Sequence, residues 1–303
     1  MAERNSCHEQ NRRSWNAVIP AHNSHKRGQA AFLRDGGSTL FPEELELCGP
    51  LTGRRVVHLQ CNCGQDSLSL AREGAEVSGI DISDVAIDFA AELSAESGIV
   101  ADFLRADLLQ WFDDFDDFDG GGESDERFDL AFSTYGTIGW LSDLDRWARG
   151  VAKVLRPGGR LVLLEFHPLV WSLCPDPDSY FHAGVIAESG GVNDYVGEGL
   201  SPSGYEQGVG PTGSFANPEP AHTYQWTVAN IVQATIDAGL QIETLREYPY
   251  ANGCRLFEGM RELPGRRYAM PEGAPDMPLM LGLVARRPSS ATMPRCRDDA
   301  MTR

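Results

Sequence analysis

Short apolar runs alternate with amphipathic segments along the chain from residue 54 onward. The amphipathic segments at 66–72, 83–98 and 142–155 predict helices; in the second of them the apolar residues recur at one-turn spacing. The intervening runs predict buried strands at 56–59, 76–80, 99–105, 128–132 and 161–164. This alternation predicts a doubly wound, Rossmann-like α/β sheet.

Several element boundaries carry recognisable signals. Ser83 is a predicted N-cap, and Gly98 is expected to end the helix that follows it. The Arg-Pro-Gly-Gly sequence at 156–159 predicts a tight turn, because proline stops a helix and glycine permits positive φ. The all-aliphatic run at 161–164 predicts a strand that is covered on both faces.

Three regions interrupt the alternation. Residues 113–126 are acidic and contain glycines, which predicts a solvated loop. Residues 167–221 are too aromatic for a linker and too broken for a long helix, so we expect an ordered insertion, partly loop, beside the sheet. A helix near 227–238 and strands at 240–248 and 279–286 then follow. The predicted organisation is an N-terminal helical lid region (1–50), a main domain (51–288) with the 167–221 insertion, and a disordered tail (289–303).

Charge and cysteine content narrow the classes of partner. The chain of 303 residues has 26 Lys and Arg against 44 Asp and Glu, a formal net charge of −18. Such acidity disfavours nucleic acid and anionic membrane surfaces as partners. No apolar stretch is long enough to span a bilayer, and the polar first twenty residues lack the apolar core of an export signal. We therefore expect a cytoplasmic protein whose seven cysteines are reduced, and no metal site at Cys61 and Cys63.

The strand ends carry a pattern typical of adenosine-type cofactor sites. Open α/β sheets bind such ligands at the carboxyl ends of their strands, where a turn after the first strand lets the backbone approach. Here that turn is 60–64, and Asp81 follows about twenty residues later, as a ribose-binding acid would. Dinucleotide-binding and methyltransferase folds share this pair. Asp107 and Leu108, after the third strand, strengthen the pattern, because Leu108 can bracket an adenine ring.

At this point the chain resembles the class I S-adenosylmethionine (SAM)-dependent methyltransferases that act on small molecules. The resemblance rests on the segments VVHLQCNCGQDSLSLA, VSGIDIS, LRADLL, FDLAFSTYG and LRPGGRLVLLEFHP, which span roughly residues 54–168. It implies a seven-stranded sheet whose last strand is antiparallel, with SAM as cofactor. The first motif would hold the methionine portion, Asp81 the ribose diol and Asp107 the adenine amino group, and Ser133 would lie beneath the sulfonium. The implied cofactor-binding residues are Gln60, Cys61, Gly64, Asp66, Asp81, Ile82, Asp107, Leu108 and Ser133.

The first motif departs from the usual family pattern. His58, Gln60 and Asn62 stand where that pattern has an acid and two glycines. Asn62 is a mild change, because asparagine tolerates left-handed backbone. If Gln60 turns outward, its side chain can hydrogen-bond the aminocarboxylate of SAM.

Candidate catalytic residues lie in the loops after the fourth and fifth strands. Tyr135 and His167 are the candidate bases, and Glu165 is expected to bind substrate or to orient His167. Each has a structural alternative: Tyr135 as a wall of the cofactor site, and His167 as the cap of a strand end.

The N-terminal region and the insertion add candidates for the substrate side. Trp15 and His22 are expected on a helical lid that excludes water, the alternative being a helix packed on the domain edge with Trp15 as its anchor. His222, near the end of the insertion, is a further candidate.

The predicted function is SAM-dependent methyl transfer to an O or N nucleophile of a small molecule, in specialised metabolism. The altered first motif keeps two alternatives open: a SAM-fold enzyme that catalyses a cyclisation, displacement or elimination, and a silent SAM-fold partner subunit. An NAD-dependent oxidoreductase is disfavoured because the chain has no G-x-G-x-x-G motif. The expected partner is a small-molecule acceptor, without nucleic acid or membrane, and a homodimer or partner subunit stays open.

Overall fold

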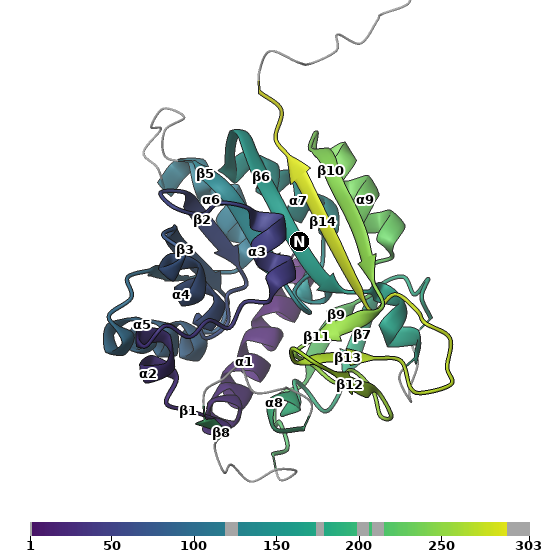
Figure 1. The fold of residues 1–303 in the computed structure, drawn as a ribbon. Coiled ribbons are helices and arrows are strands. Elements are labelled where there is room, and N and C mark those ends of the chain that lie inside the picture. Colours follow the sequence, from purple (N-terminus) through teal and green to yellow (C-terminus); the bar gives the residue numbers. More distant parts are fainter. Residues whose placement is uncertain (1, 119–126, 174–178, 199–205, 208–214, 290–303) are drawn as a thin grey trace, which may run out of the picture.

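The computed structural model describes all residues except 1, 119–126, 174–178, 199–205, 208–214 and 290–303. A seven-stranded sheet forms its centre (Figure 1). In spatial order the strands are β10 (Gln241–Tyr248), β14 (Met280–Arg286), β6 (Leu155–Phe166), β5 (Phe128–Thr134), β2 (Arg55–Leu59), β3 (Glu76–Asp81) and β4 (Asp102–Arg105).

The last strand of this sheet is antiparallel, as the sequence predicts. Strands β2, β3, β4, β5 and β6 pair in parallel. Strand β14 inserts antiparallel between β6 and β10. The carboxyl ends of the parallel strands therefore lie along one edge, where the loops after them can form a common site.

Helices cover both faces of the sheet. One face carries α6 (Leu108–Phe118), α7 (Leu144–Val154) and α9 (Val228–Asp237). The other carries α3 (Pro42–Cys48), α4 (Gln65–Arg72) and α5 (Asp84–Ser97), with α2 (Gln29–Arg34) packed on α5. In the predicted two-faced strand, Leu161 and Leu163 point into the first layer, whereas Val162 and Leu164 point into the second. All four are fully buried.

The predicted boundaries at Ser83 and Gly98 agree with the structure, and the predicted turn at 156–159 does not. The Ser83 hydroxyl accepts a hydrogen bond from Ala86 N–H, and Gly98 ends α5 at a φ of 72°. The segment 156–159, predicted as a tight turn before the strand, lies inside β6. There the pairing partner shifts from Phe128 for Leu155 to Leu130 for Arg160, so the turn is a bulge in the strand.

The acidic run at 113–126 corrects a prediction. Its first six residues belong to α6 and are not a solvated loop. Trp111, Phe112 and Phe115 lie at helical spacing and are buried against the sheet, so apolar burial fixes the helix. Asp113 forms an ion pair with Arg146 of α7. Residues 119–126 lie outside the described residues.

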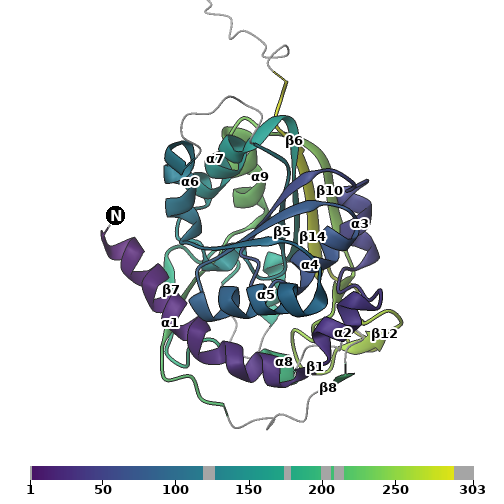
Figure 2. The ribbon, with the colours of Figure 1, turned by 90° about the vertical axis from the view of Figure 1, so that its left-hand side faces the viewer.

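The N-terminal region contains helices α1, α2 and α3 and the short strand β1. Helix α1 (Ala2–Ser24) is long, and Figure 2 shows it running along the edge of the domain beside α5. It is followed by β1 (Lys26–Arg27), which pairs with β8 (Glu206–Gln207). Helices α2 and α3 then lead into the sheet.

The described part of the 167–221 insertion consists of short elements. It comprises the 3-10 helix η3 (Pro168–Leu173), β7 (Val185–Glu188), α8 (Tyr195–Glu198) and β8. Strand β9 (Ala221–Tyr224) returns antiparallel to β7. A small three-stranded sheet was not predicted. Its strands are β11 (Tyr250–Asn252), β12 (Arg261–Leu263) and β13 (Arg267–Ala269), which come between β10 and β14 in the sequence. The tail beyond residue 289 lies outside the described residues.

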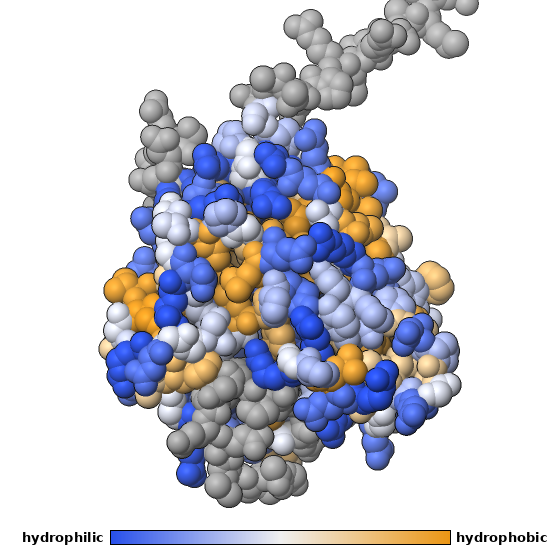
Figure 3. Space-filling view, in the orientation of Figure 1, coloured by the Kyte–Doolittle hydropathy of each residue, from blue (hydrophilic) through white to orange (hydrophobic). Residues whose placement is uncertain are grey.

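The surface seen in Figure 3 is largely hydrophilic, and hydrophobic residues show at the upper right over α9, near the centre and at the left edge. Ile236 of α9 and Leu245 of β10 are about half exposed. Among the described residues, no helix is both long enough and apolar enough to cross a membrane.

We expect Gly150→Ala to destabilise the protein. An alanine Cβ at this position in α7 would lie 2.2 Å from Phe112 Cγ of α6. Alanine ordinarily stabilises a helix by about 1 kcal/mol relative to glycine, but overpacking of a core costs about 1–3 kcal/mol. Urea unfolding should show a net loss, and a Phe112→Ala background, which lacks the clashing Cγ, should reduce it. A gain in stability from Gly150→Ala would contradict this packing.

Candidate functional site

A cavity of about 1010 Å³ opens at the carboxyl ends of the parallel strands. Gln60 and Asn62 line it after β2, Asp81 and Ile82 after β3, and Asp107 and Leu108 after β4. Cys61, Asp66, Tyr135, Glu165 and Trp15 also line it. The structure therefore brings most of the predicted site residues to one cavity.

The turn after β2 is held by the Asp81 carboxylate. Gln60 and Asn62 have φ values of 57° and 49°, the left-handed region in which the usual glycines are favoured. Asn62 N–H donates to Asp81 Oδ2 over 2.9 Å, and Ser83 N–H donates to Oδ1 over 2.8 Å. Burial raises the pKa of the Asp81 carboxyl, and these backbone donors oppose the rise. One side chain thus fixes the backbone on both sides of the predicted ribose position.

Two predicted cofactor contacts do not line the cavity. Gly64 begins α4 at a φ of 74°, and a Cβ there would lie 2.8 Å from Ala90 and Phe103. Its role in the structure is close packing. Ser133 is fully buried and hydrogen-bonds Thr137, and the neighbouring residue Thr134 lines the cavity instead.

Gln60 connects the first-motif turn to the loop after β5. Its Nε2 donates to the Thr137 carbonyl over 2.9 Å, whereas its Oε1 is buried without a hydrogen-bond partner. Glu165, at the end of β6, accepts hydrogen bonds from the backbone N–H groups of Gly136, Thr137 and Ile138. The Glu165 carboxylate therefore holds this loop. The predicted contact between Glu165 and His167 is not formed.

His167 does not line the cavity, although its chain neighbours Phe166 and Pro168 do. Its Nδ1 accepts from Leu169 N–H over 3.2 Å, and its Nε2 lies 3.0 Å from Glu247 Oε1. Burial lowers the pKa of the imidazole. Because β6 ends at Phe166, the chain turns into η3 and directs this ring to β10, so the strand-cap alternative fits the geometry.

Tyr135 lines the cavity as a neutral phenol. Asn252 Nδ2 donates to its hydroxyl oxygen over 3.0 Å. Burial, together with the charge of Glu44, raises the pKa of the phenol well above its usual value. A phenol that retains its proton can donate a hydrogen bond but is a poor base.

Glu44, on α3, is a site residue that the sequence did not indicate. Its side chain is 1% exposed and lines the cavity. Phe41 N–H donates to Oε2, and Oε1 has no partner. Burial first, and then the charge of Asp66, raise the pKa of this carboxyl well above its usual value. A glutamate three residues after the N-cap of a helix is typical of a capping box, so no local signal marks it as functional.

The segment that carries the strand-end site is similar to known methyltransferases. Residues 56–159 match a family model described as a methyltransferase domain. The ubiquinone biosynthesis O-methyltransferases of Rhizobium johnstonii and Rhizobium etli are 29% and 30% identical to the chain over 129 residues. These residues are 43% of this chain and 48% of each relative, so the chain spans about half the length of the curated relatives it matches.

The segment from β2 to the bulge in β6 thus matches a methyltransferase domain. Solved structures agree at the level of the fold. The CcbJ methyltransferase from Streptomyces caelestis is 14% identical, with a TM-score of 0.54 over 92% of this chain and 99% of that one. The [4+2]-cyclase SpnF is 17% identical, with a TM-score of 0.51 over 91% of this chain and 94% of that one.

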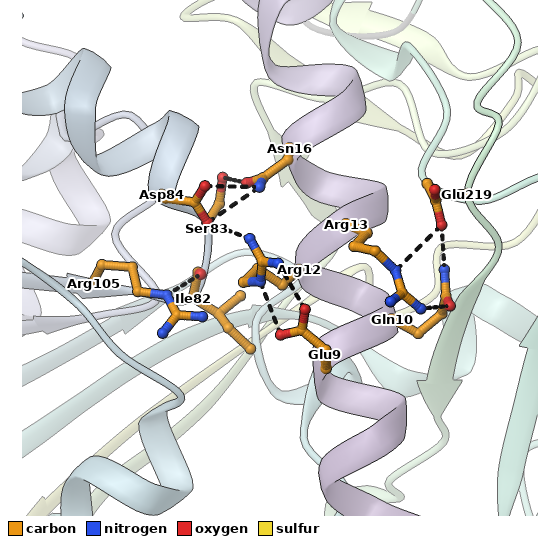
Figure 4. A network of polar contacts seen from close by, with 10 residues as sticks. All are labelled: Glu9, Gln10, Arg12, Arg13, Asn16, Ile82, Ser83, Asp84, Arg105 and Glu219. Atoms are coloured by element: carbon orange, nitrogen blue, oxygen red, sulfur yellow. Dashed lines mark hydrogen bonds and ion pairs between the residues drawn. The ribbon is translucent and has the colours of Figure 1, made fainter.

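Helix α1 contacts the methyltransferase domain at the strand ends. His8 Nδ1 lies 2.7 Å from Asp107 Oδ2, and His8 Nε2 accepts from Ser142 N–H over 3.2 Å. Figure 4 shows Arg12 and Asn16 reaching Asp84, the first residue of α5, three positions after Asp81. The predicted adenine and ribose ends of the cavity are thus both adjacent to this helix.

The opposite side of α1 is fixed to the insertion. Gln10 and Arg13 contact Glu219, as Figure 4 shows. Trp15 lines the cavity and packs edge-on against Trp140 and Tyr195. Trp15 therefore anchors the helix and forms part of the cavity wall, and the role of the helix as a lid stays a prediction.

The other two histidines predicted for the substrate side do not line the cavity. His22 is buried, and its Nε2 contacts the Asn193 carbonyl over 3.0 Å. The backbone of His222, on β9, exchanges hydrogen bonds with the Asn11 side chain, and its own Nδ1 is buried without a partner. Among the described residues, no group of His, Cys, Asp and Glu side chains could hold a metal ion.

We expect Glu165→Gln to loosen the loop after β5. The substitution keeps the shape but turns an amide NH₂ toward backbone donors, and leaving a buried donor unpaired costs about 1–3 kcal/mol. Urea unfolding should show this loss. Glu76→Gln, exposed at the start of β3, is the matched control and should change stability by less than about 0.5 kcal/mol. Equal stabilities of the two variants would contradict the role given to Glu165.

His22 should make the protein less stable as the pH falls. Burial lowers the pKa of the folded-state imidazole from 6.5 to about 4. Between these two values the unfolded chain binds a proton that the folded chain does not, so stability falls by up to about 3 kcal/mol. Denaturant titrations of wild type and His22→Gln should diverge by roughly this amount from pH 6.5 to 4. The difference should stay constant between pH 7 and 8, and a constant difference over the whole range would refute the burial argument.

Proposed function

We propose that the protein is a SAM-dependent methyltransferase that acts on an O or N nucleophile of a small molecule in a biosynthetic, specialised pathway. The observation that carries the proposal is the cavity at the strand ends, in which Asp81 holds the first-motif turn within the matched methyltransferase domain. The names of the matched relatives support O-methylation. A cytoplasmic location stays a prediction.

The cavity residues fit the chemistry of the cofactor. Asp81, Ile82, Asp107 and Leu108 all line the cavity. We assign Asp81 to the ribose diol, Asp107 to the adenine amino group, and Ile82 and Leu108 to the faces of the ring. The unpartnered Gln60 Oε1 is a buried acceptor that lacks a donor, and the ammonium of SAM is such a donor. When bound, SAM supplies an electrophilic methyl group on a sulfonium.

A small acceptor fits the enclosure of the cavity. Helix α1, β7 and β9 of the insertion, and the segment 252–258 all contribute lining residues. Trp15, Trp140 and Trp226 give it aromatic walls suited to a flat or apolar molecule. The net charge of −18 disfavours a nucleic-acid acceptor.

The side chains of the cavity favour catalysis by positioning. The Glu165 carboxylate is saturated by backbone donors, and Tyr135 keeps its proton. Holding donor and acceptor in line can contribute about 7–11 kcal/mol without a base. We therefore propose an acceptor that attacks as a neutral amine or as a readily ionised hydroxyl.

Asp81→Ala should weaken the binding of S-adenosylhomocysteine by about 100-fold or more. The change removes two backbone hydrogen bonds of the turn together with the ribose acceptor, each a charge-assisted contact of about 1.5–3 kcal/mol. Isothermal titration calorimetry measures the effect. Asp88→Ala, an exposed acid on α5, is the control and should bind like wild type.

Two results would contradict the proposed function. The first is a wild-type protein that binds neither SAM nor S-adenosylhomocysteine. The second is SAM-dependent conversion of a panel of phenols and amines without any methylated product by mass spectrometry, which would instead assign a non-methylating reaction.

A further inference from the structure

Two residues that line the cavity each carry a buried acceptor atom without a hydrogen-bond partner in the described part of the chain. These atoms are Gln60 Oε1, from the first-motif turn, and Glu44 Oε1, from α3. A buried polar atom without a partner is costly, and such atoms in native proteins are commonly satisfied by a ligand or water. The two atoms therefore mark where a bound molecule would present hydrogen-bond donors.

Glu44 lies on the side of the first-motif turn opposite the adenosine contacts. Asp81 and Asp107 follow β3 and β4, whereas Glu44 neighbours Asp66 of α4 and Tyr135 after β5. The sheet order places β2 between β3 and β5. A molecule with its adenosine at β3 and β4 would thus extend past Gln60 toward β5 and α3.

The charges at this end suit a cationic group. Glu44 and Asp66 are both acids, and the nearby His58 is a fully buried imidazole whose Nδ1 contacts Ser67 over 2.8 Å. Arg266 also lines this end and stacks 4.1 Å above the Phe41 ring. An ammonium supplies both the donors and the positive charge that the free acceptors require, whereas an anion would meet two carboxyl groups.

We propose that Glu44 and Gln60 form a subsite for the ammonium group at the amino-acid end of SAM. This inference rests on the proposed function. The first strand carries His58 where an acid is usual, so α3 supplies the carboxylate from outside the matched segment. In this proposal the carboxylate that binds the amino-acid end of SAM lies on α3 and not at the end of the first strand of the matched segment.

The subsite also couples binding to a proton. Without a ligand, burial and then the charge of Asp66 raise the pKa of the Glu44 carboxyl and favour its protonated form. Hydrogen bonds from Phe41 N–H and the Tyr135 hydroxyl, and the charge of Arg266, oppose them, and the Cys48 thiol faces the carboxyl as a neutral group. An incoming ammonium favours the ionised form, so binding releases a proton. Affinity for S-adenosylhomocysteine should rise with pH until Glu44 is ionised in the free protein.

The test compares two ligands that differ by the amino-acid end. S-adenosylhomocysteine carries it, and 5′-methylthioadenosine does not. Titration calorimetry with Glu44→Gln should show S-adenosylhomocysteine weakened about ten- to hundredfold and methylthioadenosine unchanged. Titrations in buffers of different ionisation enthalpy should show about one proton released by wild type and fewer by the variant.

The controls separate this inference from the proposed function. Glu46→Gln, on the same helix but exposed and paired with Arg246, should bind both ligands like wild type. If Glu44→Gln binds S-adenosylhomocysteine like wild type, or loses both ligands equally, the subsite is refuted although the proposed function stands. If wild type binds neither ligand, the proposed function fails and the subsite with it.

Discussion

Two carboxylates, Glu165 buried and Asp81 partly buried, hold the loops of the cavity by accepting hydrogen bonds from backbone N–H groups. Asp81 binds the turn after β2 and the start of the loop before α5, and Glu165 binds three consecutive amides after β5. Such bonds keep loops ordered without a regular ladder, since they satisfy backbone groups that would otherwise need water. The positions of Gln60, Tyr135 and the other lining residues depend on these two side chains.

Hydrogen bonds explain how the first motif can have Gln60 and Asn62 where glycines are usual. Gln60 and Asn62 both adopt left-handed backbone, which costs a non-glycine residue about 1–2 kcal/mol. The hydrogen bond from Asn62 backbone N–H to Asp81 offsets part of this cost. The Gln60 side chain donates a hydrogen bond to the Thr137 carbonyl. The glutamine side chain thereby joins two loops that a glycine would leave unconnected.

The sheet could be predicted from the sequence because strand burial, helix caps and the spacing of turn residues are local signals. Ser83, Gly98 and the 161–164 run act as their residue types suggest. The role of Glu44 could not be predicted, since it depends on a contact between α3 and loops far away in the sequence. The same holds for His167, whose partner Glu247 lies on another strand, eighty residues later. The small β11–β13 sheet was missed because its strands are three residues long.

The contacts of α1 with the insertion set the order in which the protein can be completed. Asn11 bonds to the backbone of His222, 211 positions later, and Ser14 bonds to the Glu219 carbonyl, 205 positions later. Contacts of such sequence separation carry a large loop-closure entropy and form late in folding. Helix α1 must therefore wait for the segment 219–222 before the two can enclose the cavity. The segment 56–159, which carries the family motifs, lacks both partners and would be an open scaffold by itself.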